Sequence, residues 1–428
     1  MQASSKSKFA LLPVASRYKT VRQQTEALAK PLSAEDCQLQ SMPDASPTKW
    51  HLAHLTWFFE TFILEKYESN FKPFDASFRV LFNSYYNGVG DKHPRAQRGL
   101  ISRPTLCDVL AYRQAIDERV LMLLAAQPHD SGLSQLITLG LQHEQQHQEL
   151  LLTDIKHALA LNPAQPAYAK RWPLSSTAPQ PVTWHSYNGG LVEHGFNAAD
   201  GKFAFDNETP RHRACIAPFE LASRLVTNGD YMSFIADGGY QRPGLWLSMG
   251  WDWVQAGQHK LPLYWQAAPS GYENFTLHGT VDVDPNTPAC HLNYFEADAF
   301  ARWSGARLPT EFEWEYAANQ IKTPISGNFV ESTAYHPMPL QHAKSDGPSQ
   351  LFGDVWEWTQ SNYNPYPGYQ PWEGLVGEYN SKFMCNQFVL RGGSCATPQS
   401  HIRASYRNFF PPDARWQFSG LRLARGVG

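Results

Sequence analysis

Residues 131–160 read SGLSQLITLGLQHEQQHQELLLTDIKHALA and predict one long amphipathic helix that carries two histidines. His143 and His147 are four residues apart, so on a helix both side chains point from the same face, about one turn apart. Such a pair can bind a single metal ion, although a polar helix face in contact with water gives the same pattern. Glu149 lies on another side of this helix, so we expect it to support a metal site rather than to be a ligand.

The segments that precede this helix carry the same helical periodicity. Residues 15–67 read as helices, and within them Ser46 and Pro47 are a suitable N-cap and first residue for a helix that is apolar on most faces. Residues 104–127 form another amphipathic helix. Four long helices in the N-terminal part of the chain predict a helix bundle.

A third metal ligand is expected on the apolar helix, in the stretch KWHLAH (49–54). His51 and His54 lie there among apolar residues, and an imidazole that faces a core needs a partner. One of the two completes a three-histidine site, for which iron(II), zinc and copper all remain open. A di-iron site is not expected, because Glu144 and His147 make one Glu-x-x-His element and the helical half holds no second one.

Composition excludes several classes of function. The 428 residues predict two or three domains, and the net charge of −3 comes without any long Lys/Arg block, so neither nucleic acid nor an anionic membrane is an expected partner. The 6 cysteines form no Cys-x-x-Cys pair, which favours the reducing cytoplasm over a disulfide framework. No secretory signal and no run of 18 apolar residues is present, so we expect no transmembrane helix.

The amino-acid composition and the hydrophobic pattern change after Leu161. We expect a helical domain over residues 1–165 and a linker rich in Pro, Ala and Ser over 166–181. Residues 182–428 then predict a loop-rich α+β domain with many Gly and Pro and few long helices. Two short helices stand out in that domain, at 294–305 and 310–320.

Six motifs in order carry a resemblance to a known family. They are SMPDASPTKWHLAHLTWFFETF (41–62), FNSYYNGVGDKHPRAQRG (82–99), HEQQHQELLLTDIKH (143–157), ARLPTEFEWEYAA (306–318), GDVWEWT (353–359) and LRGGSCATP (390–398). Together they resemble the non-haem iron sulfoxide synthases of ergothioneine biosynthesis, the hercynine oxygenases, over nearly the whole chain. The resemblance implies a DinB-like four-helix bundle followed by a domain like the formylglycine-generating enzymes, which is a variant of the C-type lectin fold.

The motifs of the second domain keep a structural interpretation. Formylglycine-generating enzymes use a pair of cysteines near the end of this domain, whereas here no cysteine follows Cys395. Copper chemistry based on thiols is therefore not expected, and we expect Cys395 to be a buried structural residue.

The resemblance also implies the site. Its metal is Fe(II), with O2 as co-substrate, and its ligands match His54, His143 and His147, while His51 is left as a core residue or a support for a ligand. The small-molecule substrates are hercynine, which is trimethylhistidine, and a thiol. Tyr85 and Tyr86 match the tyrosines that deliver a proton during oxygen chemistry. Arg95 and Arg98, expected to be exposed in a loop, would bind the carboxylate of the thiol. The remaining expected substrate contacts are Gln146, Asn408, Phe409, Phe410 and Trp416, with core packing as an equal alternative for Trp416.

The sulfur donor is open between cysteine and γ-glutamylcysteine. Phe410 stands where relatives that use γ-glutamylcysteine have an acidic residue, which favours free cysteine. Three alternatives remain: a selenoneine synthase that joins a selenosugar to hercynine, an ovothiol-type synthase, for which an added methyltransferase domain is missing, and a non-catalytic protein that binds a metal or ligand.

Overall fold

A computed structural model describes residues 13–170, 177–343, 347–374, 377 and 380–427. The chain divides into two compact units. The first comprises Met1–Ala169 and Glu373–Tyr379, and the second comprises Lys170–Trp372 and Asn380–Gly428.

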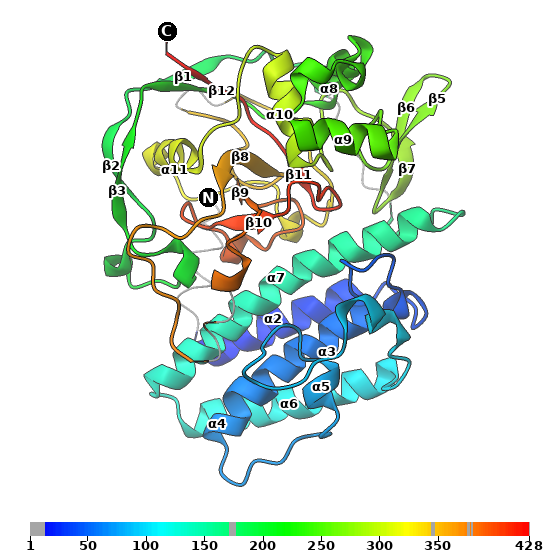
Figure 1. The fold of residues 1–428 in the computed structure, drawn as a ribbon. Helices are drawn as coiled ribbons and strands as arrows, with labels where there is room; N and C mark the ends of the chain where they lie inside the picture. The colour runs from blue at the N-terminus through cyan, green and yellow to red at the C-terminus, as the bar shows by residue number, and fades with distance from the viewer. Residues whose placement is uncertain (1–12, 171–176, 344–346, 375–376, 378–379, 428) are drawn as a thin grey trace. The chain divides into compact units, whose positions relative to one another are not determined.

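The first unit is the expected helix bundle (Figure 1). Helix α7 packs against α2 and α3, and α3 also packs against α6. The four long helices are α2 (Val14–Ala29), α3 (Thr48–Phe59), α6 (Leu106–Ala126) and α7 (Ser131–Leu161). The shorter pieces are the 3-10 helices Asp36–Gln38 and Arg95–Leu100 and the α-helices α4 (Glu65–Tyr67) and α5 (Phe78–Leu81).

Local signals explain where these helices begin. Thr105 and Asp108 form a capping box at the start of α6, and the side chain of Asp130 accepts the backbone N–H of Leu133 at the start of α7. Helix α3 begins at Thr48, so Pro47 rather than Ser46 is its N-cap, one residue later than expected, and no side chain caps it. All residues of α3 are buried, which accounts for its apolar character on most faces.

Helix α3 does not stop at Phe59 but continues into a π-helical turn, Glu60–Leu64. Glu60 is buried there, and its carboxylate accepts the hydroxyl of Tyr112 and, at 2.7 Å, the backbone N–H of Phe74. These two bonds hold the wide turn in place, since π-helical turns are rare without a specific stabilising contact.

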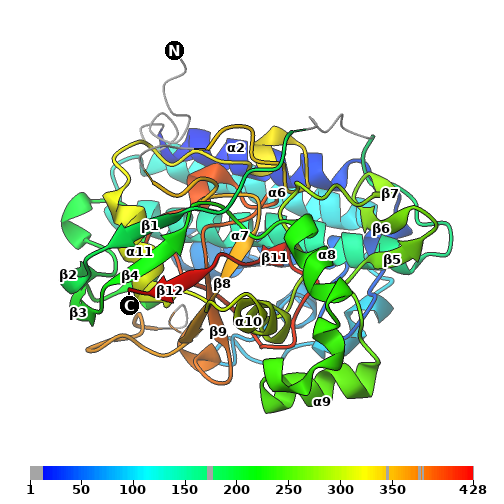
Figure 2. The same ribbon diagram turned by 90° about the horizontal axis from the view of Figure 1, so that it is seen from above.

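The second unit is built from short strands in several small sheets (Figure 1). The central one has the order β10-β9-β8-β11, and all its pairs are antiparallel except β8 with β11. A second sheet has the order β1-β4-β12, so the last strand of the chain lies beside an early one (Figure 2). The strands are β1 (Trp184–Tyr187), β2 (Gly190–His194), β3 (His212–Ile216), β4 (Phe219–Ala222), β5 (Trp265–Ala268), β6 (Gly271–Thr276), β7 (Gly279–Asp282), β8 (Trp356–Asn362), β9 (Phe388–Arg391), β10 (Asn408–Phe410), β11 (Ser419–Gly420) and β12 (Ala424–Gly426).

The helices of the second unit correct one expectation. The predicted helices are present as α10 (Tyr294–Trp303) and α11 (Glu311–Gln320), but α8 (Asn228–Ala236) and α9 (Ser248–Gly257) were missed. Both missed helices span fewer than three turns and lie in a Gly- and Pro-rich part of the sequence that favoured loops. The capping box of Thr227 and Asp230 at the start of α8 is the signal that could have revealed it.

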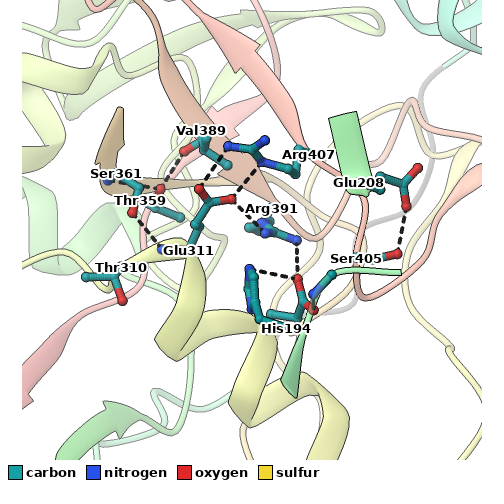
Figure 3. Close-up of polar contacts among 12 residues, drawn as sticks. His194, Glu208, Thr310, Glu311, Thr359, Ser361, Val389, Arg391, Ser405 and Arg407 are labelled. Carbon is teal, nitrogen blue, oxygen red and sulfur yellow. Dashed lines mark hydrogen bonds and ion pairs between the residues drawn. The ribbon is translucent and has the colours of Figure 1, made fainter. Parts of the chain in front are cut away.

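Charged side chains tie the motifs of the second unit together in its interior (Figure 3). Glu311 on α11 accepts hydrogen bonds from Arg391 at 2.8 Å and from Arg407 at 2.9 and 3.0 Å. Arg391 also reaches Glu315 at 3.1 Å, and His194 lies 3.3 Å from the same carboxylate oxygen. Each of these groups is buried and paired, which favours a structural role for the motifs that carry them. Cys395 is also fully buried.

Among the residues that the structure describes, no helix is both long enough and apolar enough to cross a membrane.

Candidate metal centre

Three imidazoles converge inside the helix bundle. His54 comes from α3, and His143 and His147 come from α7, so the packing of these two helices brings them together. One ring nitrogen of each lies within 4.8 Å of the others, and all three side chains are buried. In the described part of the chain, no other group of histidine, cysteine or acidic residues is arranged in this way.

A backbone carbonyl orients the ring of His54. Its Nδ1 lies 2.6 Å from the carbonyl oxygen of Phe82, which can only accept, so Nδ1 carries the proton and donates it. The other nitrogen, Nε2, is buried and has no hydrogen-bond partner among the described residues. A buried nitrogen lone pair without a partner is costly, and a metal ion at the centre of the three rings would satisfy it.

A second histidine orients the ring of His147. The Nδ1 of His147 lies 2.8 Å from the Nδ1 of His51, whose Nε2 lies 3.1 Å from the Oδ2 of Asp154. His51 therefore supports a candidate ligand through a hydrogen bond, and its own two nitrogens are both engaged. The Nε2 of His147 is left to face the other two rings.

Burial keeps the three imidazoles neutral. It lowers the pKa of His143 to about 3, and it lowers the pKa values of His54 and His147 far below the usual range. The neighbouring histidines add to the shift of His54 and His147, since positive charges on adjacent rings would repel each other. A neutral imidazole is the form that binds a metal ion, so the site is ready for one at ordinary pH.

Glu144 does not belong to this group. Its buried carboxylate pairs with Arg113 at 2.5 Å and with Arg22 at 3.0 Å, and it accepts the hydroxyl of Thr25 at 2.6 Å. Burial alone would raise the pKa of Glu144, but the two arginines outweigh it and lower the pKa to about 2. Glu144 therefore serves the packing of the bundle, while His147 of the same Glu-x-x-His element belongs to the three-histidine group.

Two tryptophans enclose His54, and the sequence had not singled them out. The ring of Trp50 stacks on His54 at 4.5 Å between centroids, and Trp57 stacks on it at 5.5 Å. The two lie four residues before and three residues after His54, so they share its helix face. That spacing was the available signal.

Arg98 corrects an expectation about the thiol-binding arginines. Arg95 is exposed as expected, and its guanidinium donates to the carbonyl oxygen of Asp44. Arg98 is buried instead, where it donates to the hydroxyl oxygens of Ser46 at 2.9 Å and Ser84 at 3.0 Å. Burial, followed by the charge of Arg95, lowers the pKa of Arg98 to about 9.

Arg98 makes no direct ion pair in the described part of the chain, although the carboxylate of Asp154 is near enough to raise its pKa in part. Its guanidinium carbon lies 3.4 Å from the centroid of the Trp50 ring. A buried cation that rests on an aromatic ring without a direct ion pair is suited to an incoming anion.

The two tyrosines occupy different environments. Tyr86 is buried, with its ring 5.7 Å from Trp57 and 5.0 Å from Phe62 of the π-helical turn. Tyr85 is half-buried, and the two tyrosine rings lie 4.7 Å apart. Trp57 thus contacts both Tyr86 and His54.

The other predicted substrate contacts have mixed surroundings. Gln146 is half-buried on α7, next to His147. In the second unit, Phe409 stacks on Tyr363 at 4.0 Å, which indicates a packing role, and the Oδ1 of Asn408 accepts the N–H of Phe409 at 3.0 Å. In the same unit, Phe410 and Trp416 meet edge to face with their centroids 6.4 Å apart.

Comparisons with known proteins agree with this architecture. The model of the DinB superfamily matches residues 17–151, and that of the sulfatase-modifying factor enzyme 1-like domain matches residues 176–427. A hercynine oxygenase of Mycobacterium tuberculosis is 33% identical over 424 residues, which cover 91% of this chain and 94% of the relative. A hercynine oxygenase of Mycolicibacterium smegmatis is 32% identical, with 92% and 94% covered. Ergothioneine biosynthesis protein 1 of Schizosaccharomyces pombe is 26% identical over 52% of this chain and 28% of that protein.

Proposed function

Because the chain belongs to the hercynine oxygenase family, we propose that it joins hercynine to a thiol at an iron(II) ion held by His54, His143 and His147. The convergence of three buried imidazoles, with the Nε2 of His54 lacking any partner, is the observation that carries this proposal. In the overall reaction, the imidazole C2–H and the thiol S–H are lost and a carbon–sulfur bond forms. One atom of O2 becomes the sulfoxide oxygen and the other leaves in water.

The donor set suits iron(II). Three neutral imidazoles bind a borderline divalent metal without adding negative charge, and they leave coordination positions open for a thiolate, the hercynine imidazole and O2. Iron(II), when bound, supplies the redox chemistry that O2 requires and lowers the pKa of a coordinated thiol. The burial of the three rings keeps competing water away from that chemistry.

We propose that Arg98 binds the carboxylate of the thiol substrate. Arg95 lies at the exposed end of the same 3-10 helix, Arg95–Leu100. The buried guanidinium of Arg98, which makes no direct ion pair among the described residues, supports this role, because a planar guanidinium binds a carboxylate through two parallel hydrogen bonds. The apolar Phe410 favours cysteine as the thiol. The scattered cysteines, with no Cys-x-x-Cys pair, fit a reducing cytoplasm, where such a thiol stays reduced.

We assign proton delivery to the pair Tyr85 and Tyr86, because the ring of Tyr86 packs against Trp57, which stacks on His54, and the ring of Tyr85 lies beside that of Tyr86. Gln146, Asn408, Phe410 and Trp416 stay as proposed contacts to hercynine. The trimethylammonium group has no proton to donate, so aromatic faces and amide oxygens are the groups that suit it.

The proposal is tested by oxygen uptake. The full chain is loaded with Fe(II) without air and then given hercynine with cysteine, γ-glutamylcysteine or a selenosugar in parallel reactions. We expect uptake of one O2 per sulfoxide formed with cysteine, identified by mass spectrometry. A product only with the selenosugar would instead support a selenoneine synthase, and no uptake with any donor would refute the enzyme activity.

A further inference from the structure

A chain of buried hydrogen bonds leads away from His147 to groups that do not face the centre of the three rings. The Oδ2 of Asp154 accepts the backbone N–H of Ser46 at 2.8 Å and lies 3.1 Å from the Nε2 of His51. His51 then reaches His147 through the contact of 2.8 Å between their Nδ1 atoms. Ser46, His51 and Asp154 are all buried, so water does not compete for these bonds.

The order of donors along this chain follows from its outer end. Because Asp154 Oδ2 already accepts the backbone N–H of Ser46, it acts as an acceptor, and the Nε2 of His51 donates to it. When the one ring proton of His51 lies on Nε2, its Nδ1 is an acceptor and the Nδ1 of His147 donates. The Nε2 of His147 then carries the lone pair and is the nitrogen available to a metal ion shared with His54 and His143.

We propose that His51 and Asp154 are positioning residues, which hold the proton of His147 on Nδ1 and aim its Nε2 at the metal. The proposal rests on the assignment of His147 as a ligand in the proposed function. His51 would orient the ring of His147 in the way that the backbone carbonyl of Phe82 orients the ring of His54. The two ligands differ in one respect: the support of His147 consists of side chains, so substitution can remove it.

This chain of hydrogen bonds extends to Arg98. The hydroxyl oxygen of Ser46 accepts a hydrogen bond from Arg98 at 2.9 Å, while the N–H of Ser46 faces Asp154. Ser46 is therefore shared between the arginine proposed to bind the thiol and the chain that orients His147.

The test uses Co(II) as a spectroscopic probe of the full chain, so that its readout does not depend on activity. We expect Asp154→Ala and His51→Gln to weaken Co(II) binding roughly 10–100-fold and to shift its visible absorption band, as loss of such a support typically does. His51→Asn should bind within a few-fold of wild type, because its amide oxygen can occupy the place of Nδ1 and accept from His147.

Asp154→Asn is the second conservative variant. The N–H of Ser46 requires an acceptor at the Oδ2 position, so the amide oxygen should stay there and preserve the donor order. Binding within a few-fold of wild type is expected. A purely structural role for Asp154 predicts no difference in the Co(II) spectrum between the Ala and Asn variants once both are folded.

Two controls separate the outcomes. His157→Asn removes another histidine of α7, whose Nδ1 lies 2.7 Å from the Oγ of Ser41, and it should leave Co(II) binding unchanged. His54→Ala should abolish binding, and if it does not, the ligand assignment itself fails. Loss in His54→Ala together with wild-type binding and spectra in His51→Gln and Asp154→Ala would overturn this inference alone. If Asp154→Ala does not fold, equal binding by His51→Gln and His51→Asn overturns it.

Discussion

The guanidinium of Arg98 rests 3.4 Å above the ring of Trp50, and the other stacking partner of Trp50 is His54. A cation, an indole and a candidate metal ligand thus form a continuous stack inside the bundle. The stack fixes the distance between the proposed anchor of the thiol substrate and the metal, so removal of the cation should affect one substrate selectively.

Arg98→Met should raise KM for the thiol and leave KM for hercynine nearly unchanged. A hydrogen bond to a charged group contributes about 1.5–3 kcal/mol, so the increase should be about 10–100-fold. Arg95→Met is the matched comparison and should have a smaller effect, because Arg95 is exposed. Equal effects on the KM values of both substrates would contradict this role. Steady-state oxygen uptake measures both constants.

Tyr85→Phe and Tyr86→Phe should separate the two candidate acids. Loss of the proton donor is expected to lower the yield of sulfoxide about 100-fold or more, since general acid catalysis typically contributes a factor of about 100–10,000. The other variant should keep most of its activity. Product analysis by mass spectrometry at matched oxygen consumption distinguishes them, and full sulfoxide yield in both variants would exclude either tyrosine as the acid.

Glu144→Gln should destabilise the protein without removing the metal site. The variant leaves the buried charges of Arg22 and Arg113 short of a partner, which costs about 3–5 kcal/mol of unfolding free energy. Glu65→Gln, which breaks an exposed pair with Arg79, should cost less than about 1 kcal/mol. Urea unfolding measures both, and Co(II) should still bind one per chain. Loss of Co(II) binding without loss of stability would instead make Glu144 a ligand.

Asp354→Asn should change how stability depends on pH. Burial raises the pKa of Asp354 to about 6, against about 3.9 for an aspartate in an unfolded chain. Between these values the folded protein keeps a proton that the unfolded chain has released, so stability is greatest below about pH 4 for this group and falls as pH rises through about 6.

The asparagine variant cannot titrate, so its unfolding midpoint should fall less than that of wild type between about pH 4 and pH 6. The hydrogen bonds that Asp354 accepts from Met338 N–H, Asn328 and Gln350 require an oxygen, which asparagine can supply in part. Above about pH 6 the difference between the two midpoints should no longer change, because Asp354 is then ionised in both the folded and the unfolded chain. Parallel curves for the two proteins would contradict the assignment.

Local patterns were enough to predict the bundle and to offer candidates for a three-histidine site. Four-residue spacing places His143 and His147 on one helix face, and an imidazole in an apolar helix identified His54 as a candidate. The resemblance to a family then selected His54 over His51. Asp154, seven residues after His147 and so two turns along α7, was visible in the sequence but had no pattern that linked it to His51.

Tertiary contacts account for what the sequence did not reveal. Arg98 is buried against Ser46, Ser84 and Trp50, which lie between 14 and 52 residues away in the sequence. A local sequence pattern cannot predict contacts over such separations. The short helices α8 and α9 were missed because the Gly- and Pro-rich sequence around them favoured loops, although the apolar residues of α9 recur at helical spacing.

The π-helical turn Glu60–Leu64 lies between α3 and α4 and changes the direction in which the side chains after it point, relative to those before it. A wide turn is equivalent to one inserted residue, so it rotates everything that follows by about 100° without moving what precedes it. Deletion of a single residue there would turn Glu65–Tyr67 to a new face while His54 kept its place. The sequence after the turn can therefore change in length by one residue, as in an alignment gap between relatives, while the position of His54 is kept.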